Sequence, residues 1–178
     1  MNEELSVLGD VAERFNRSGI AYMLTGSMAL NLYAEPRMTR DMDIVLELNT
    51  ETAQALIDLF EPDYYISQEE IEFALRTRSM FNLIHHATVI KIDCIVRKPD
   101  EYSLAAFARR KKMKIDGFEI DVISKEDLIV AKLLWLKESD SAQQKRDIQT
   151  LLQTGYDTAL LQTLTEKLNL SSLLETLR

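Results

Sequence analysis

Hydrophobic side chains recur every three or four residues between positions 4 and 17, where they form one helical stripe that ends before Gly19. Elsewhere the apolar positions alternate with polar ones or form short runs, and both patterns are typical of strands. The patterns predict strands over residues 20–24, 41–48, 64–67, 80–85, 89–96, 111–115 and 118–123. They predict helices over residues 4–17, 28–34, 50–60 and 69–76, and over about eight residues after Pro99.

From Ser124 onward the apolar period is helical, with short breaks, as far as the last residue. Helices and strands alternate before that point, which favours helices layered on a sheet. We therefore expect an α+β fold in which residues 1–123 form a mixed sheet with flanking helices. Residues 124–178 should form a C-terminal helical segment that packs on this core.

The composition is that of an ordinary globular protein, with 46% hydrophobic and 28% charged residues. Cys94 is the only cysteine, so a disulfide framework and a multi-cysteine zinc site are excluded, and we expect a small buried hydrophobe there. The longest apolar run, Leu128–Leu136, is interrupted by Lys132 and is too short to span a bilayer. The first residues lack the pattern of a secretion signal, so we expect a cytoplasmic protein without membrane contact.

Two acidic residues, Asp41 and Asp43, stand two positions apart at the start of a predicted strand. Residues at that spacing point to the same face of a strand, so both carboxylates are directed toward one point. Such a pair suits Mg²⁺, which prefers oxygen ligands and retains waters and substrate phosphates in its shell. A solvated strand edge explains the same triplet without any metal.

The turn Thr25-Gly26-Ser27 follows one apolar strand and precedes a helix. Free backbone N–H groups at a helix start, together with the Ser27 hydroxyl, favour a phosphate at this place. An ordinary helix cap, with Ser27 as the capping residue, is the structural alternative.

Together with a third acid on a later strand, these motifs resemble the nucleotidyltransferase superfamily that includes DNA polymerase beta. The matching positions are Thr25, Gly26, Ser27, Arg37, Thr39, Asp41, Asp43 and Asp93. The resemblance implies that Gly26 and Ser27 hold a nucleoside triphosphate and that the three aspartates are the catalytic, metal-binding residues for two Mg²⁺ ions. It also implies nucleotide contacts from Arg37 and Thr39, and a role for Asp93 in activating the incoming hydroxyl group.

Two later helical motifs are similar to those of the small bacterial branch that contains minimal nucleotidyltransferases and abortive-infection toxins. In that branch the helix around Lys132 supplies a nucleotide-contacting lysine. A later Lys/Arg-Asp motif matches Lys145-Arg146-Asp147, and the resemblance implies that Asp147 belongs to the nucleotide-binding residues. Lys132 lies in a run that is apolar nearly all round, so its ammonium group needs a phosphate or carboxylate partner. Alternatively its stem packs and its ammonium group reaches water, and Asp147 is a solvated helix residue.

These features predict an enzyme that moves a nucleoside monophosphate from an NTP to a hydroxyl group of an RNA, such as the 3′ end of tRNA, or of a protein. The resemblance also implies a possible toxin with an antitoxin partner. The alternative is a non-catalytic nucleotide sensor or partner-binding module on the same fold. A glycosyltransferase is disfavoured because only 40 residues precede the acidic pair.

The net charge of −8 repels nucleic acid unless basic side chains are concentrated locally. One such concentration, residues 109–114, lies beside a predicted edge strand and either holds an RNA backbone or protects that edge from aggregation. Arg37 and Arg40 precede the acidic pair, where guanidinium groups suit triphosphate charge, and a surface position is the alternative for Arg40. His85 and His86 are adjacent on a strand and so face opposite sides, which excludes a shared metal.

Overall fold

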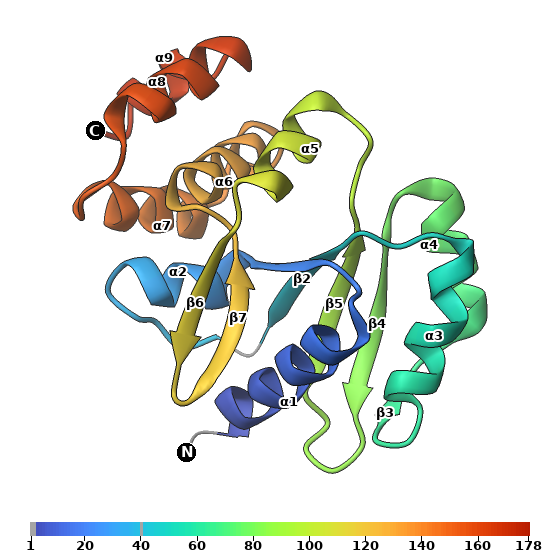
Figure 1. Cartoon of the computed structure of the whole chain (residues 1–178). Coiled ribbons are helices and arrows are strands. Elements are labelled where there is room, and N and C mark those ends of the chain that lie inside the picture. Colours follow the sequence, from blue (N-terminus) through green and yellow to red (C-terminus); the bar gives the residue numbers. More distant parts are fainter. Residues whose placement is uncertain (1–2, 40) are drawn as a thin grey trace.

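The computed structural model describes residues 3–39 and 41–178 as an α/β structure built around one sheet (Figure 1). Its strands are β1 Tyr22–Thr25, β2 Met42–Leu46, β3 Tyr64–Tyr65, β4 Met80–His85, β5 Lys91–Val96, β6 Lys111–Ile115 and β7 Phe118–Val122. Its helices are α1 Glu3–Ser18, α2 Gly26–Tyr33, α3 Thr50–Phe60, α4 Gln68–Thr77, α5 Glu101–Ala108, α6 Lys125–Ser139, α7 Ala142–Leu152, α8 Thr158–Lys167 and α9 Ser171–Glu175. The predicted fold class is confirmed.

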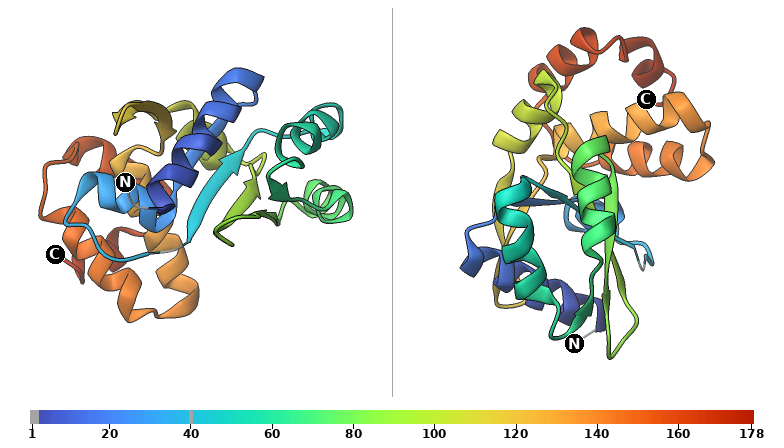
Figure 2. Two further views of the ribbon diagram at one scale, coloured as in Figure 1. Left: turned by 90° about the horizontal axis from the view of Figure 1, so that it is seen from below. Right: turned by 90° about the vertical axis from the view of Figure 1, so that its right-hand side faces the viewer.

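The seven strands form a mixed sheet in the order β3-β4-β5-β2-β1-β7-β6. The pairs β2–β5 and β1–β7 are parallel, and the other pairs are antiparallel. Helices cover both faces, because α1, α3 and α4 pack together on one side while α2 packs with α6 and α7 on the other (Figure 2). Strands β1 and β2 therefore lie between the two groups of helices.

The two faces of β2 and β5 differ in chemistry. On one face Met42, Ile44 and Leu46 pair in register with apolar residues of β5, and all are buried in the core. Cys94 belongs to this face and is fully buried, as expected. The opposite face carries Asp43 and Asp93, so the predicted alternation of apolar and polar positions separates the core from the site.

Local signals set several ends of these elements where the sequence predicted them. Asn49 caps α3, because its side-chain oxygen accepts hydrogen bonds from the backbone N–H groups of Glu51 (3.0 Å) and Thr52 (2.9 Å). The hairpin between β6 and β7 turns at Asp116 and Gly117, which both have positive φ angles.

Several strands are shorter than predicted. The strand predicted over residues 41–48 is Met42–Leu46, and the one predicted over residues 118–123 ends at Val122. Two further differences have a local cause. The strand predicted over residues 64–67 ends at Tyr65, because Ser67 instead accepts a hydrogen bond from the Glu70 N–H group (3.3 Å) and caps α4. The strand predicted over residues 89–96 begins at Lys91, because Val89 lies in the left-handed region with a φ of 58°. Both corrections come from residues that adopt turn or cap conformations.

The C-terminal helices are joined to one another by buried polar groups at the start of α6. The Lys125 ammonium group donates to the carbonyl oxygen of Gly155 at 2.9 Å, and Glu126 accepts from the Asp157 N–H group at 2.7 Å. These bonds fix the turn between α7 and α8 against α6. In the part of the chain that the structure describes, none of the helices combines the length and the apolar character needed to cross a membrane.

Candidate active site

One row of residues runs across the middle of the sheet and brings the predicted acids together. Asp43 on β2 is paired in register with Thr25 on β1 and with Asp93 on β5. Asp93 is in turn opposite Asn82 on β4. Because residues directly opposite each other on neighbouring strands share a face, these four side chains lie on the same side of the sheet.

The turn after β1 lies directly against the Asp43 carboxylate. A Cβ atom built on Gly26 would lie 2.0 Å from Oδ2 of Asp43, and Gly26 has a φ of +65°. Both facts require glycine, since any side chain would be strained in this backbone conformation and would collide with the carboxylate. The phosphate-binding candidate and the acidic candidate are therefore parts of one site.

The start of α2 is available to an anion. Its N-cap residue, Thr25, makes no side-chain hydrogen bond to the helix, whereas side chains cap α3, α4, α5, α6, α7 and α8. The first N–H groups of α2 thus have no capping side chain, and the helix dipole favours negative charge there. The Ser27 hydroxyl group, in this first turn, accepts a hydrogen bond from Nη2 of Arg37 at 2.5 Å.

A buried carboxylate on α7 holds two cations of the site. Asp147 accepts hydrogen bonds from Nε and Nη2 of Arg37, both at 2.9 Å, and from the ammonium group of Lys132 at 2.7 Å. Gln143 donates a further bond at 2.8 Å. Asp147 is 2% exposed and Lys132 is 5% exposed. Asp147 is therefore not a solvated helix residue, and the partner that Lys132 requires is this carboxylate.

The pKa values of Asp147 and Lys132 are both lowered, although for different reasons. Burial disfavours the charged form of Asp147, but the hydrogen bonds from Arg37, Lys132 and Gln143 outweigh it and hold the pKa of Asp147 below its ordinary value. Burial is also the main cause for Lys132, and it lowers the pKa of that ammonium group against the opposing effect of Asp147. Asp147 is thus a firmly ionised anchor for the cations.

The acidic residues repel one another electrostatically. Burial, followed by the charges of Asp93 and Asp41, raises the pKa of Asp43 above its ordinary value. Asp93 is held by Asn82, whose Nδ2 lies 2.5 Å from Oδ1, and by Lys91, whose ammonium group lies 2.9 Å from the same oxygen. Asp41 precedes β2 and is exposed. A divalent cation would neutralise the excess negative charge around Asp43.

The three carboxylates do not form a complete metal site by themselves. Within residues 3–39 and 41–178, no three histidine, cysteine, aspartate or glutamate side chains stand together as a metal site. The metal-binding role of Asp41, Asp43 and Asp93 therefore stays a prediction, and the fit to a cation rests on their shared charge.

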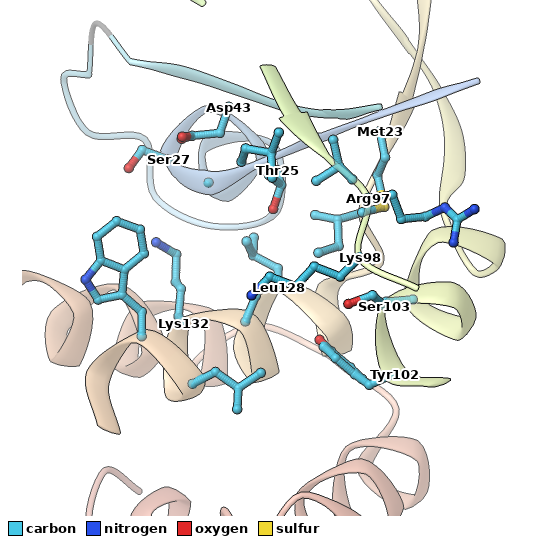
Figure 3. A pocket seen from close by; sticks show the side chains of 18 of the residues that line it. Met23, Thr25, Ser27, Asp43, Arg97, Lys98, Tyr102, Ser103, Leu128 and Lys132 are labelled. Atoms are coloured by element: carbon cyan, nitrogen blue, oxygen red, sulfur yellow. The ribbon is translucent and has the colours of Figure 1, made fainter. Parts of the chain in front are cut away.

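A cavity of about 420 Å³ opens beside Asp43, between the sheet and helices α5 and α6 (Figure 3). Gly26, Ser27 and Asp43 lie at one end, and Lys132 extends toward them from α6. The middle is lined by apolar side chains from β1, β2, β5 and α6. These are Met23, Val45, Ile95, Leu128, Ala131 and Leu134.

The cavity also contains residues that the sequence did not single out. Lys98, Tyr102 and Ser103 lie at the end away from Ser27, and Trp135, which is 63% exposed, lines the wall formed by α6. The only sequence signal for Trp135 was the presence of the single tryptophan within the apolar run Leu128–Leu136. Asn82 gave no signal, because only the strand register places it next to Asp93.

Other candidates lie elsewhere. Thr39 does not line the cavity, and its hydroxyl group accepts from the Asp41 N–H group at 3.3 Å. Nδ1 of His85 lies 2.9 Å from the Thr88 hydroxyl group, and His86 lies in the following turn, so no shared metal is indicated. Arg40 is outside the described residues.

The basic residues 109–114 lie at and before β6, the edge strand of the sheet far from the acids. Much of their charge is already paired. Arg109 makes two hydrogen bonds to buried Asp127, at 2.9 and 2.8 Å, while Arg110 and Lys112 are ion-paired with Asp121. The edge-strand interpretation is thereby favoured over an open nucleic-acid surface.

Comparison with protein families gives one match. The model of the Aminoglycoside-2''-adenylyltransferase family matches residues 7–162, which is well over half of the chain. None of the curated proteins compared with the chain matches it.

Solved structures of similar fold include an antigenic nucleotidyltransferase-like protein from Paracoccidioides brasiliensis, with 21% identity, a TM-score of 0.61 and coverage of 98% of this chain and 93% of that one. The antibiotic-resistance factor ANT(2'')-Ia has 10% identity and a TM-score of 0.63, covering 94% and 91%. The lincosamide antibiotic adenylyltransferase LnuA has 16% identity and a TM-score of 0.52, covering 85% and 96%. These likenesses support the nucleotidyltransferase fold.

Proposed function

The chain belongs to the Aminoglycoside-2''-adenylyltransferase family and is a nucleotidyltransferase, and from this premise we propose that it transfers an adenylyl group from ATP to a hydroxyl group and releases pyrophosphate. The observation that carries the proposal is the row formed by Thr25, Asp43 and Asp93, with Gly26 packed against Asp43. It joins a phosphate-binding turn to the acids that phosphoryl-group transfer requires.

In this proposal the triphosphate lies over the start of α2. The N–H groups of Gly26 and Ser27 donate to phosphate oxygens, while Lys132 and Arg37 supply positive charge from positions fixed by Asp147. The adenosine extends into the apolar part of the cavity, where Trp135 offers a flat surface for the base. Thr39 contacts the nucleotide only if the loop before β2 closes over it.

Mg²⁺ would be held by Asp41, Asp43 and Asp93. Burial, together with the charges of Asp93 and Asp41, raises the pKa of Asp43 there. When bound, the cation would neutralise phosphate charge and make the α-phosphorus more electrophilic. Asp43 and Asp93 fit this role because they are oxygen ligands on one face, with no sulfur or imidazole ligand beside them in the row, and the charge of Asp41 acts on Asp43.

Asp93 is the proposed acceptor of the proton. As the hydroxyl oxygen forms its bond to the α-phosphorus, its proton passes to the Asp93 carboxylate, and the bond between the α-phosphorus and the bridging oxygen breaks. The electron pair of that bond leaves with pyrophosphate, whose negative charge is met by Lys132 and the start of α2. Asn82 keeps the Asp93 carboxylate directed toward the row.

The related proteins and the sequence motifs point to different acceptors. The names of similar proteins refer to aminoglycoside and lincosamide antibiotics, whereas the sequence predicted an RNA or protein hydroxyl group. The toxin role, the antitoxin partner and the abortive-infection branch stay predictions. A reaction that consumes ATP needs a compartment that contains it, in keeping with the expected cytoplasmic location. The non-catalytic sensor is disfavoured, because a binder has no need of three mutually repelling carboxylates.

The test is incubation of the purified chain with ATP labelled at the α-phosphate, Mg²⁺ and a cell extract. Labelled product and pyrophosphate should appear with the native chain and disappear with Asp41→Ala or Asp43→Ala. Asp58→Ala, which removes an exposed acid from α3, is the control and should keep full activity. Transfer that survives both active-site substitutions would refute the proposal.

A further inference from the structure

The sheet face continues beyond Asp93 onto β4 and β3, and this part lies outside the cavity described above. Tyr65 is paired with Ile84, and Ile84 with Lys91. Met80 and Asn82 alternate with Ile84 along β4. We call these residues, Tyr65, Met80, Asn82, Ile84 and Lys91, the outer sheet face.

The register places the outer sheet face on the same side as Asp43 and Asp93, because Asn82 is opposite Asp93. The residues that alternate with it, Tyr64, Phe81 and Leu83, are buried in the core. By contrast Tyr65 is 50% exposed and Met80 is 46% exposed, and the side chain of Lys91 is 46% exposed. The sheet thus presents a solvent-exposed aromatic and apolar surface next to the third acid.

The direction of transfer determines which side the acceptor must use. If pyrophosphate leaves over Gly26 and Ser27, at the β1 end of the row, the attacking oxygen must approach from the opposite end. That end is Asp93 and Asn82, where the outer sheet face begins. The acceptor therefore has to lie over β5 and β4 while its hydroxyl group reaches Asp93.

The chemistry of this surface limits the acceptor. Lys91 is its one charged side chain, and Asp93, which is opposite Asn82, is already bonded to Lys91 and Asn82. A polycationic amino sugar needs unpaired carboxylates, and none of the five residues supplies one. Tyr65, Met80 and Ile84 instead offer one aromatic ring and two apolar side chains, which suit a flat group.

We propose that the outer sheet face binds the acceptor, and that this acceptor is a hydroxyl compound with a flat apolar group and without positive charge. The inference rests on the proposed function, since it uses the direction of adenylyl transfer. It separates this chain from the polycationic acceptors that the family name denotes.

The experiment uses the full chain with methyl-labelled methionine, Mg²⁺ and a non-hydrolysable ATP analogue, and it follows the methyl resonance of Met80 by NMR. The resonance is assigned with Met80→Leu. The probes are para-nitrophenyl glucoside, which joins a flat ring to uncharged hydroxyl groups, and tobramycin, which carries several ammonium groups. The glucoside should shift the Met80 resonance saturably, and tobramycin should leave it in place.

Substitutions locate the contact. Tyr65→Ala should weaken glucoside binding about fivefold, as expected for the loss of one stacked ring, and Tyr65→Phe should restore it. Phe73→Ala is the matched control, because Phe73 is similarly exposed, at 54%, but lies on α4, which packs against the opposite face. It should leave the affinity unchanged.

The outcomes distinguish the two proposals. An analogue that fails to change the fluorescence of Trp135, the only tryptophan, would refute the proposed function. A bound analogue with no glucoside effect at Met80, or with a saturable shift caused by tobramycin, would refute the acceptor assignment alone.

Discussion

Gly26 begins α2 and Asp43 lies on β2, yet the Asp43 carboxylate occupies the space that a side chain at position 26 would need, with Oδ2 only 2.0 Å from a Cβ atom built there. The backbone at Gly26 also has a φ of +65°. The contact therefore couples the position of the phosphate-binding turn to the position of the central acid.

Gly26→Ala should reduce adenylyl transfer about a hundredfold, because a displacement of about 1 Å at a reacting group has an effect of this size. Gly19→Ala is the matched control, since Gly19 has a φ of +73° but nothing within 4 Å of a built Cβ atom. Gly26→Ala should lose more stability than Gly19→Ala in denaturant unfolding, because it adds a collision to the backbone strain that both share, and only Gly26→Ala should lose activity. An equal loss of activity would show that backbone strain alone is responsible.

Asp43→Asn should stabilise the metal-free protein while abolishing transfer. The pKa of Asp43 is raised, so the folded state binds this proton more tightly than the unfolded chain does, and ionisation at neutral pH costs stability. Removing the charge should raise the free energy of unfolding by about 1 kcal/mol. Saturating Mg²⁺ should stabilise the native chain by about 2 to 3 kcal/mol and the variant much less. Thermal unfolding with and without Mg²⁺ measures both effects, and equal stabilisation would contradict the metal assignment.

Asp147→Asn should destabilise the protein by about 3 kcal/mol, because it leaves the buried ammonium group of Lys132 without its carboxylate. Asp140→Asn removes a carboxylate that is 88% exposed and paired with Lys145, so it should change stability by less than about 0.5 kcal/mol. Urea unfolding compares the two. If Asp147→Asn and Asp140→Asn change the free energy of unfolding by similarly small amounts, water reaches the pair of Lys132 and Asp147.

The lowered pKa of Asp147 predicts that stability depends on pH. The pKa of Asp147 is lowered in the folded state, so its contribution to stability is fully present above the unfolded value of about 3.9 and is lost as the pH falls through the folded value. The urea midpoint of the native chain should therefore drop more steeply in acid than that of Asp147→Asn. Parallel curves for the two proteins would exclude Asp147 as the cause.

Arg109→Gln should destabilise the protein by about 2 kcal/mol, because Asp127 is fully buried and receives two hydrogen bonds from this guanidinium group. Lys114→Gln, on the exposed edge strand, should change stability by less than about 0.5 kcal/mol. Chemical denaturation measures both. If Arg109→Gln and Lys114→Gln both weaken RNA binding and do not differ in stability, the nucleic-acid interpretation of residues 109–114 is supported instead.

The sequence predicted the elements best where one residue sets the local backbone. Gly19, Asn49 and the Asp116-Gly117 pair stop, start or turn the chain through their own conformational preferences, so their signals can be read without the rest of the molecule. The strand over residues 64–67 was too long because Ser67 has a local alternative, a helix cap, that competes with pairing.

The candidate site was only partly predictable. The acids and the glycine turn form a short motif, so the sequence displays them directly. Asn82, Lys91 and Trp135 reach the site through strand register and helix packing, which depend on contacts between distant segments. The partner of Lys132 was also only partly predictable. The sequence indicated that its ammonium group needs an anion, but only the fold identified Asp147 as that anion.

In the proposed function, the ion pairs of Asp147 with Arg37 and Lys132 make nucleotide binding depend on segments far apart in the chain. Grafting the sheet with its acids onto another scaffold would carry over the ligands for a cation but leave Arg37 without its anchor. A transplant that keeps the chemistry must include α7, and a library that varies α7 freely would lose catalysis without touching a single reacting group.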